Sequence, residues 1–380
     1  MKVLFWLSAI LLFYSYLGYP LVMFCIAVCK RKRQIIKASI TPQISVVIPA
    51  YNEERNIGAK LNDILNSDYP QDRMEVFVIS DASTDSTDDI VKGFADRGVK
   101  LFRLNERSGK IAAYRKVLPL LKGEIIIFSD ATSILETDSI SNLINNFYDE
   151  SVGCAGGLLM YINPKDATIG NSERKYWKYE KNIRRMENQL SSLPSVSGTF
   201  YAVRKKLYPL DMKDDLADDL IVPFNVRKAG LRTVLEPSAL CKDFTTLNIQ
   251  DEMGKRVRIT VQNIRGLLAY PEILNPFKYG LFSLLVISHK LFRLLAPIFM
   301  IVLFVSNLFL SFHSWLFLLV FIAQVAFYAA GINGYTIYKR TKFSLANTLF
   351  YFCLSNLAVF IGMIKFFNGE KVISWETVRA

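Results

Sequence analysis

The sequence predicts an α/β domain with a mostly parallel sheet, flanked on both sides by transmembrane helices. Three observations lead to this prediction. Apolar residues make up 51% of the 380 residues, and the longest uncharged stretches lie near the two ends. The middle of the chain alternates between strand-like and helix-like patterns. Carboxylates follow several of the expected strands, which points to a polar site at one edge of the sheet.

The N-terminal element is expected to be a transmembrane helix over residues 1–29. Residues 3–29 contain no charge, and a helix of about 20 apolar residues already crosses the hydrocarbon layer. A cleaved signal peptide is the alternative, but its apolar region would be shorter and its basic end would come first. Here the basic run, residues 30–33, comes after the apolar stretch. The positive-inside rule therefore places this run, and the middle of the chain, in the cytoplasm.

The C-terminal third repeats the apolar pattern. Residues 294–338 are uncharged with a polar break at 311–314, and residues 343–364 form a further apolar run. We expect three transmembrane helices within 294–367, followed by a tail over 368–380. Residues 277–293 are apolar but interrupted by Lys278, Lys290 and Arg293. Because their uncharged run is too short to span, they are interpreted as an interfacial amphipathic helix.

The soluble middle is expected to form one domain over residues 41–270. Strand-like segments at 44–48, 76–80, 100–104 and 125–130 alternate with helical patterns at 56–67, 85–97 and 110–121. In sheets of this kind, ligands bind beyond the carboxyl ends of the strands. Tyr51, Glu53, Asp81 and Asp130 all fall at such ends.

Composition excludes several classes of site. The five cysteines form no CxxC pair, so a zinc site or a disulfide framework is not expected. Both histidines lie in the apolar C-terminal third, so a base in the polar middle must be mainly Asp or Glu. No GxGxxG follows the first strand, and Leu104 breaks the Walker pattern before Gly109-Lys110. The net charge of +12 is concentrated at the membrane flanks, so no nucleic-acid partner is expected.

Carboxylates with scattered Lys and Arg suit a nucleotide diphosphate bound together with a divalent cation, because hard cations take carboxylate oxygens and share phosphates. A helix beginning near Gly109 would add backbone N–H donors for the phosphates. The alternative for Asp81 and Asp130 is a purely local role, as caps of turns and helices.

Five motifs together resemble the family-two glycosyltransferases, which have a GT-A fold, over residues 42–270. They are SVVIPAYNEERNI, VISDASTDSTDDI, SGKIAAYRKVLPLLKGEIIIFSDA, VSGTFYAVRKKLYP and DDLADDLIVPFNVRKAGLRTVLEP. Apolar helices on both sides of the domain are similar to the polysaccharide-synthase branch, which includes cellulose, hyaluronan and poly-N-acetylglucosamine synthases. The resemblance implies an inverting transfer of sugar from a nucleotide-diphosphate sugar, with UDP as the expected nucleotide, to a glycan or lipid-linked acceptor.

The resemblance also implies a role for each matching residue. Asp219 matches the catalytic base, and Ser197, Gly198 and Thr199 match the floor on which the acceptor rests. Asp130 matches the first carboxylate of the metal-binding DxD motif, which implies Mg²⁺ or Mn²⁺ as cofactor. The donor-binding positions are Pro49, Tyr51, Glu53, Asp81, Lys110, Asp130, Gln262 and Arg265.

The sequence departs from the family pattern at two positions. Thr132 stands where DxD has its second carboxylate, and Gly266 stands where the QxxRW motif of processive synthases has Trp. Two alternatives therefore stay open: transfer of a single sugar to a polyprenyl phosphate, and an inactive subunit that binds nucleotide sugar. As a transferase, the protein is expected to be an integral protein of the inner or plasma membrane with a cytoplasmic catalytic domain. Membrane lipids, and proteins of polysaccharide export, are its expected partners.

Overall fold

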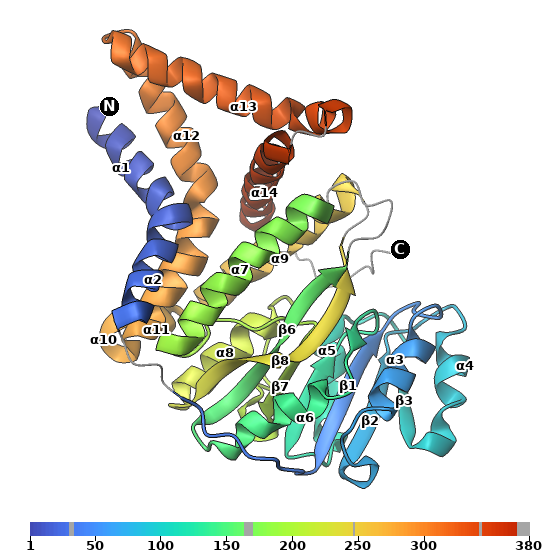
Figure 1. Ribbon diagram of the computed structural model, residues 1–380. Helices are drawn as coiled ribbons and strands as arrows, with labels where there is room; N and C mark the ends of the chain where they lie inside the picture. The colour runs from blue at the N-terminus through green and yellow to red at the C-terminus, as the bar shows by residue number, and fades with distance from the viewer. Residues whose placement is uncertain (30–33, 163–169, 246–247, 342–343, 371–380) are drawn as a thin grey trace.

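A computed structural model describes residues 1–29, 34–162, 170–245, 248–341 and 344–370. Its centre is an eight-stranded sheet with the order β3-β2-β1-β4-β7-β6-β8-β5 (Figure 1). The strands are β1 Ile44–Ala50, β2 Met74–Ser80, β3 Val99–Arg103, β4 Ile125–Ser129, β5 Ile134–Leu135, β6 Val152–Ile162, β7 Phe200–Arg204 and β8 Arg232–Phe244.

The first four long strands follow the expected βαβ pattern. β1 pairs in parallel with β2 and β4, and β2 pairs in parallel with β3. All seven residues of β1 are buried, as expected for a central strand covered on both faces. β7 runs antiparallel to both β4 and β6, so the sheet is mixed. The α/β domain with a mostly parallel sheet that the sequence predicts is confirmed.

Helices cover both faces of the sheet and produce two apolar cores. One core joins α3 and α6 to one face, and the other joins α5 and α8 to the opposite face. The helices of the domain are α3 Ile57–Leu65, α4 Thr87–Lys92, α5 Lys110–Val117, α6 Ser139–Ile144, α7 Gly170–Leu190, α8 Asp218–Lys228 and α9 Ile249–Ala269. The long helices α7 and α9 lie between the sheet and the apolar helices (Figure 1).

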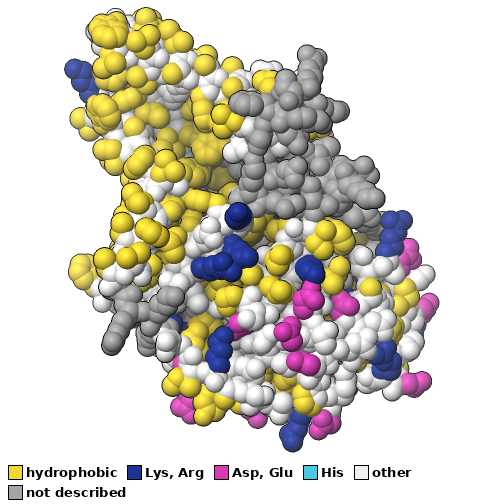
Figure 2. Space-filling model, viewed as in Figure 1, with side chains coloured by type: hydrophobic (Ala, Val, Ile, Leu, Met, Phe, Trp, Pro, Cys, Tyr) yellow, Lys and Arg dark blue, Asp and Glu magenta, His cyan; other side chains and the backbone are white. Residues whose placement is uncertain are grey.

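Four helices among the described residues are long and apolar enough to cross a membrane. They are Lys2–Cys29, Leu281–Ser311, Trp315–Ile337 and Leu345–Phe367. The first comprises α1 Lys2–Phe13, a π-helical turn and α2 Tyr19–Cys29. The second includes α12 Phe292–Ser311, and the last two lie within α13 Trp315–Thr341 and α14 Ser344–Phe367. Hydrophobic side chains cover α1 and α12 on the face that Figure 2 shows. Their number agrees with the four spans expected from the sequence.

The chain is helical across residue 293, where the sequence predicted a boundary between an interfacial helix and the first of three spans. The short helix α10, Pro276–Tyr279, ends at Gly280, whose φ of +60° is a conformation that suits glycine. From Leu281 the chain then runs through α11 Leu281–Leu285, a π-helical turn Val286–Leu291 and α12 without a break. Two polar side chains of this helix contact α7: Arg293 pairs with Glu180, and His289 contacts Glu180 and Glu187. The basic run at 30–33 and residues 371–380 of the tail lie outside the described residues.

Helix α9 ties the catalytic domain to the apolar helices. It packs along α14, where a side chain at Gly362 would meet Thr260 of α9 at 2.7 Å. Only glycine permits this approach. The domain and the apolar helices are therefore in direct contact.

Candidate functional site

Lys110, Asp130 and Gly198 meet at the carboxyl edge of the sheet. Asp130 follows β4 directly, and Lys110 is the first residue of α5. The Lys110 ammonium donates to Asp130 Oδ1 at 3.2 Å and to the Gly198 carbonyl at 3.3 Å. The backbone N–H of Asp130 donates to the Thr199 carbonyl at 3.0 Å, which holds the 197–199 loop beside the strand end.

Asp219 lies against the same loop. It is in the first turn of α8, and its carbonyl accepts from the Val196 N–H at 2.9 Å. A methyl group added at Gly198 would lie 3.6 Å from Asp219 Cβ, so the glycine leaves room directly over the carboxylate. The structure thus brings together Lys110, Asp130, Gly198 and Asp219, which lie far apart in the sequence.

The two neighbouring carboxylates of α8 have different surroundings. Asp218 is buried and accepts a hydrogen bond from the Tyr201 hydroxyl at 2.6 Å. Asp219 is partly exposed. Burial, together with the charge of Asp218, raises the pKa of Asp219 to about 6, while the charges of Lys290, Lys110 and Arg184 oppose the rise. Neighbouring cations and the Asp218 carboxylate thus shift the pKa of Asp219 in opposite directions.

Lys110 remains charged in this environment. Burial alone would lower the pKa of its ammonium, but the charges of Asp130, Asp218 and Asp219 outweigh burial and raise the pKa above its usual value. A permanently charged ammonium beside Asp130 can hold a phosphate oxygen.

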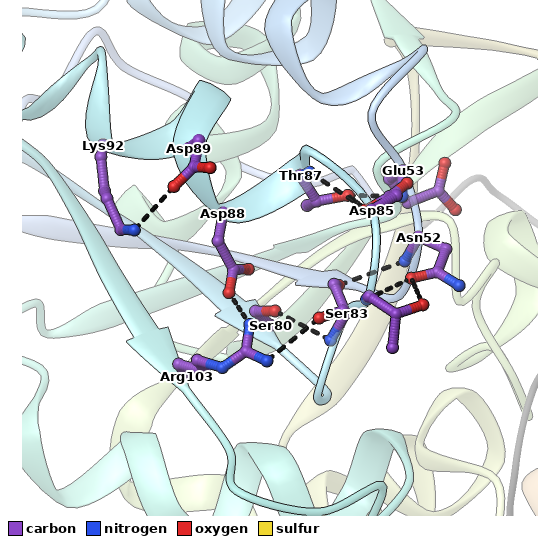
Figure 3. A network of polar contacts seen from close by, with 11 residues as sticks. Asn52, Glu53, Ser80, Ser83, Asp85, Thr87, Asp88, Asp89, Lys92 and Arg103 are labelled. Atoms are coloured by element: carbon purple, nitrogen blue, oxygen red, sulfur yellow. Dashed lines mark hydrogen bonds and ion pairs between the residues drawn. The ribbon is translucent and has the colours of Figure 1, made fainter.

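The segment after β1 forms a tight polar network with the segment after β2. Asn52 adopts a φ of +54°, and its side-chain oxygen accepts from the Thr84 N–H at 2.8 Å. The Glu53 N–H donates to the Thr87 hydroxyl at 2.8 Å (Figure 3). The Glu53 carboxylate accepts from the Asn56 side chain at 2.8 Å. This network fixes the backbone that follows Tyr51.

Tyr51 and Pro49 belong to the same edge of the sheet. The ring of Tyr51 is partly exposed and lies 3.8 Å from the guanidinium carbon of Arg107. Pro49 is buried in β1, opposite Ile79 of β2. Pro49 therefore shapes the strand end from within the sheet, while Tyr51 presents a flat ring at its surface.

Asp81 is engaged differently from the expectation. Its carboxylate is fully buried and accepts from the backbone N–H groups of Ser108, at 2.7 Å, and Gly109, at 3.1 Å. The sequence predicts that backbone N–H groups near Gly109 bind phosphates, but these two N–H groups bind Asp81. The alternative role for Asp81 was a local cap of turns and helices. In the structure its carboxylate binds the turn before α5, which is distant in the sequence.

A second carboxylate lies near Asp130 although the DxD motif is incomplete. Asp243 is close to the end of β8, and its Oδ1 accepts from the Thr132 hydroxyl at 3.4 Å. Burial and the charge of Asp130 raise the pKa of Asp243 to about 6. No local sequence signal marks this residue, because β8 meets β5 only in the folded chain, where Lys242 pairs with Ile134.

Lys60 supports the turn that carries Asp130. Its ammonium is buried and donates to the Ser133 carbonyl and hydroxyl at 2.9 and 2.8 Å. The Ser133 hydroxyl in turn donates to the Asp130 carbonyl at 2.9 Å. A sequence signal for this role exists: Lys60 shares the apolar face of α3 with Ile57 and Ile64.

Gln262 and Arg265 lie one turn apart on α9, where both are partly buried. Arg265 is ion-paired with Asp215 and donates to the Glu370 carbonyl at 2.9 Å. Gly266 is buried, and a side chain there would meet Leu220 of α8 at 2.9 Å. The position that holds Trp in QxxRW is thus a helix contact, with no room for an aromatic ring.

The residues present fit a divalent cation only in part. Within the described chain no group of three potential ligands from His, Cys, Asp and Glu is assembled. Asp130 and Asp243 offer carboxylate oxygens of the kind that Mg²⁺ and Mn²⁺ prefer. A cation here would need its remaining ligands from donor phosphates and water.

Comparison with known proteins gives a consistent result. Residues 45–209 match the family model described as glycosyl transferase family 2. The chain is 32% identical over 140 residues to a beta-monoglucosyldiacylglycerol synthase of Nostoc sp., covering 36% of this chain and 28% of that protein. It is 27% identical over 220 residues to the probable glycosyltransferase YdaM of Bacillus subtilis, covering 52% of this chain and 50% of that protein. The chain thus spans half or less of the length of these curated relatives.

The fold comparison covers nearly the whole chain. The mannosyltransferase PcManGT from Pyrobaculum calidifontis, solved in complex with GDP-Man and Mn²⁺, superposes with a TM-score of 0.71 at 20% identity, covering 96% of this chain and 99% of that chain. The shared architecture therefore includes the apolar helices as well as the sheet. Residues 45–209 thus resemble glycosyl transferase family 2, and the whole chain shares the fold of PcManGT.

Proposed function

We propose that this protein is a membrane glycosyltransferase that moves a sugar from a nucleotide-diphosphate sugar to a lipid-linked or glycan acceptor, with inversion at the anomeric carbon. The observation that carries the proposal is the meeting of Lys110, Asp130 and Asp219 around Gly198. This arrangement sets an ammonium that can bind phosphate, and a carboxylate that can bind a metal, beside the carboxylate of Asp219.

Asp219 is the proposed general base. A pKa of about 6 leaves its carboxylate ionised at neutral pH yet basic enough to accept a proton. The acceptor oxygen would lose its proton to Asp219 as it forms a bond to the anomeric carbon. The bond from that carbon to the diphosphate breaks in the same step, and the nucleoside diphosphate leaves with the electron pair.

The proposed donor site lies on the other side of Gly198. Lys110 would bind the diphosphate, and the ring of Tyr51 would contact the nucleoside. Asp81 would act on the nucleotide mainly by ordering the turn at 108–109, since its oxygens already accept two N–H groups. We keep UDP as the expected nucleotide, and GDP is tested beside it because PcManGT was solved with GDP-Man.

Asp130 and Asp243 are the proposed protein ligands of Mg²⁺ or Mn²⁺. The cation would supply positive charge that stabilises the departing diphosphate. Lys110 contributes a second charge to the same leaving group, and Lys60 holds the turn on which Asp130 sits. Full activity in excess chelator would contradict this part of the proposal.

The acceptor side favours short products over a long polymer. Gly266 packs against Leu220, so α9 has no ring at this position on which an acceptor sugar could stack. Arg265 is paired with Asp215. It could contact the donor, as the sequence predicts, only in a conformation in which this ion pair is broken. Transfer of a single sugar to a polyprenyl phosphate therefore remains a second candidate.

The membrane arrangement proposed from the sequence places residues 30–278 in the cytoplasm, where nucleotide sugars are made. Lys92 is an exposed residue of α4, far along the chain from any apolar helix. A cysteine engineered at Lys92 should be modified by a membrane-impermeant reagent only after the cells are opened. Labelling in intact cells would reverse the orientation.

The deciding experiment for the activity uses the purified protein with labelled UDP- and GDP-sugars, lipid acceptors and Mn²⁺. We expect release of the nucleoside diphosphate and a labelled lipid product whose size reports one sugar or many. Binding of a nucleotide sugar with neither transfer nor hydrolysis would favour the inactive subunit. A product that retains the configuration of the donor would contradict inversion.

A further inference from the structure

Helix α3 joins two parts of the proposed donor site. It follows residues 51–56, here called the nucleoside segment, and it contacts the turn at residues 130–133, here called the cation turn. The Glu53 carbonyl accepts from the Asn56 N–H at 2.9 Å, and the Asn56 carbonyl accepts from the Lys60 N–H at 3.0 Å. The Asn56 side chain also donates to the Glu53 carboxylate at 2.8 Å. Lys60 thus belongs to the helical turn that continues directly from the nucleoside segment.

The side chain of Lys60 reaches the cation turn. Its ammonium donates to the Ser133 carbonyl at 2.9 Å and to the Ser133 hydroxyl at 2.8 Å. The Ser133 hydroxyl donates to the Asp130 carbonyl at 2.9 Å, and the Ser133 N–H donates to the same carbonyl at 3.3 Å. The hydroxyl also lies 3.2 Å from that of Ser129, the last residue of β4. A displacement of Lys60 would therefore displace the turn that carries Asp130.

Both proposed cation ligands depend on the cation turn. Asp130 is its first residue. The hydroxyl of Thr132, within the turn, donates to Asp243 Oδ1 at 3.4 Å, so the second carboxylate is joined to the same four residues. A continuous series of hydrogen bonds and adjoining backbone thus runs from the nucleoside segment through Lys60 to both carboxylates.

Lys60 lies where an apolar side chain is expected. Only 1% of its surface is exposed, and it shares the buried face of α3 with Ile57 and Ile64. Burying an ammonium is unfavourable unless its charge is paired or hydrogen-bonded. Within the described part of the chain this ammonium forms no ion pair, and its hydrogen bonds go to Ser133. An apolar side chain would pack on this face without that cost, so packing alone does not account for a lysine here.

The nucleoside segment has a conformation that a bound ligand can stabilise. Asn52 has a φ of +54°, which is uncommon for a residue other than glycine. Asn52 and Glu53 are held by the hydroxyls of Ser83 and Thr87 in the next βα unit (Figure 3). A nucleoside bound to the ring of Tyr51 would order this segment further, and α3 with it. Because coupling between two sites is reciprocal, a cation bound at the cation turn would order the nucleoside segment to the same extent.

We propose that Lys60 is a positioning residue that couples the binding of the nucleoside to the binding of the cation. Lys60 holds Ser133, and thereby Asp130, in the place that the nucleoside segment sets. The cation turn is then ordered by the nucleoside itself, in addition to any oxygens that the diphosphate offers to the cation. This inference rests on the proposed function and adds to it a link, through the protein, between the two halves of the donor.

A nucleoside without phosphates tests this link, because it has no phosphate oxygen to offer the cation. Purified protein in detergent is titrated with Mn²⁺ by calorimetry, with and without uridine or guanosine. We expect the nucleoside that fits the site to raise the Mn²⁺ affinity by about 5- to 10-fold, at the low end of usual couplings. Lys60→Met should reduce this factor to below about twofold. Ser133→Ala, which keeps the carbonyl contact of Lys60 but loses the hydroxyl, should reduce the factor in part.

The matched control is Leu61→Ala, which removes a fully buried side chain from the next position in α3. It should lower the melting temperature, as Lys60→Met does, but should leave the coupling intact. Thermal unfolding of each variant shows whether it is folded. An Mn²⁺ affinity that neither nucleoside changes, or normal coupling in both folded variants of Lys60 and Ser133, would overturn the proposal. So would loss of coupling in Leu61→Ala, because the stability of α3 would then explain the effect. Coupling as expected, with no sugar transfer, would instead contradict the proposed function alone.

Discussion

The donor side and the membrane side of the site are held together in different ways. On the donor side, Asn52 and Glu53 bond to residues of the next βα unit, largely through backbone N–H groups and hydroxyls. On the membrane side, His289 is held by Glu180 and Glu187, charged residues more than a hundred positions away in the sequence. The donor side depends on backbone geometry, whereas the membrane side depends on buried charge.

This difference predicts different consequences of substitution. A donor-side change removes a contact from a loop whose backbone has many other bonds, so it should alter binding or chemistry more than stability. A membrane-side change can leave a buried charge without its partner, which costs more than the net value of the pair. Asp219 lies at the junction, where both sides act on one carboxylate.

The largest effect is expected at this junction. Asp219→Asn keeps the size of the side chain but cannot accept a proton, so turnover should fall by roughly 10²–10⁴-fold. Donor affinity, measured by titration with the nucleoside diphosphate, should change little. Asp211→Asn, an exposed substitution in the loop before α8, serves as the control. Near-normal turnover in Asp219→Asn, or loss of donor binding, would show that another carboxylate such as Asp215 is the base.

The membrane side should respond in stability. His289→Ala leaves Glu187 with only the Tyr19 hydroxyl and removes one partner of Glu180. The free energy of unfolding should fall by about 1–3 kcal/mol, the usual cost of leaving a buried acceptor without its hydrogen-bond partner. The other histidine, His313, is exposed in the turn after α12, so His313→Ala is a matched control. Equal melting temperatures in detergent for both variants would refute the contrast between the two sides.

Substitution of Asp130 should affect cation binding, whereas substitution of an ordinary surface carboxylate should not. Asp130→Asn should weaken donor binding and turnover together, because it removes a ligand that acts in both. Asp243→Asn should reduce the affinity for Mn²⁺ in the presence of nucleoside diphosphate by about 10–100-fold. Calorimetry or Mn²⁺ resonance reports this without turnover. Asp72→Asn, at an exposed position, should have no effect. Unchanged Mn²⁺ affinity in Asp243→Asn would leave Asp130 as the single protein ligand.

The rate should also depend on pH through Asp219. Its pKa of about 6, raised by burial and by the charge of Asp218, lies above the usual value for Asp. A base works only when it is deprotonated, so turnover should be constant near pH 7. Below about pH 6 it should fall by about tenfold per unit. The residual activity of Asp219→Asn should lack this acid limb. A flat profile of the native protein between pH 5 and 7 would contradict the assignment.

The sequence predicted the donor side better than the membrane side, and the reason is physical. Tyr51, Asp81 and Asp130 each follow the last residue of a strand. Because the carboxyl ends of parallel strands meet at one edge of the sheet, these residues were expected to lie close together. Asp243 and Lys290 could not be found in this way. The position of Asp243 depends on a pairing between distant strands, and Lys290 interrupts an apolar run whose partner, α7, lies far back in the chain.

The same limit applies to two local features of the sequence. Lys290 and Arg293 suggested that residues 277–293 were separate from the spans, because the groups that meet their charges were not visible in the local sequence. Glu180 binds Arg293, so the helix continues through both residues. Likewise, the N–H groups near Gly109 looked free for phosphates, although Asp81 accepts them. In both places a distant carboxylate decides the role of a local motif.

The smallest predicted effect tests whether the two sides act on Asp219 in opposite directions. Asp218→Asn keeps an acceptor for the Tyr201 hydroxyl but removes a negative charge that raises the pKa of Asp219. The acid limb of the rate profile should therefore move to lower pH. Arg184→Gln removes a positive charge that opposes the rise, so the limb should move to higher pH. Each shift should be under about one pH unit, which corresponds to less than about a tenfold change in rate. Shifts in the same direction would mean that the substitutions act through packing rather than charge. The charges of the membrane side would then not determine the pKa of Asp219.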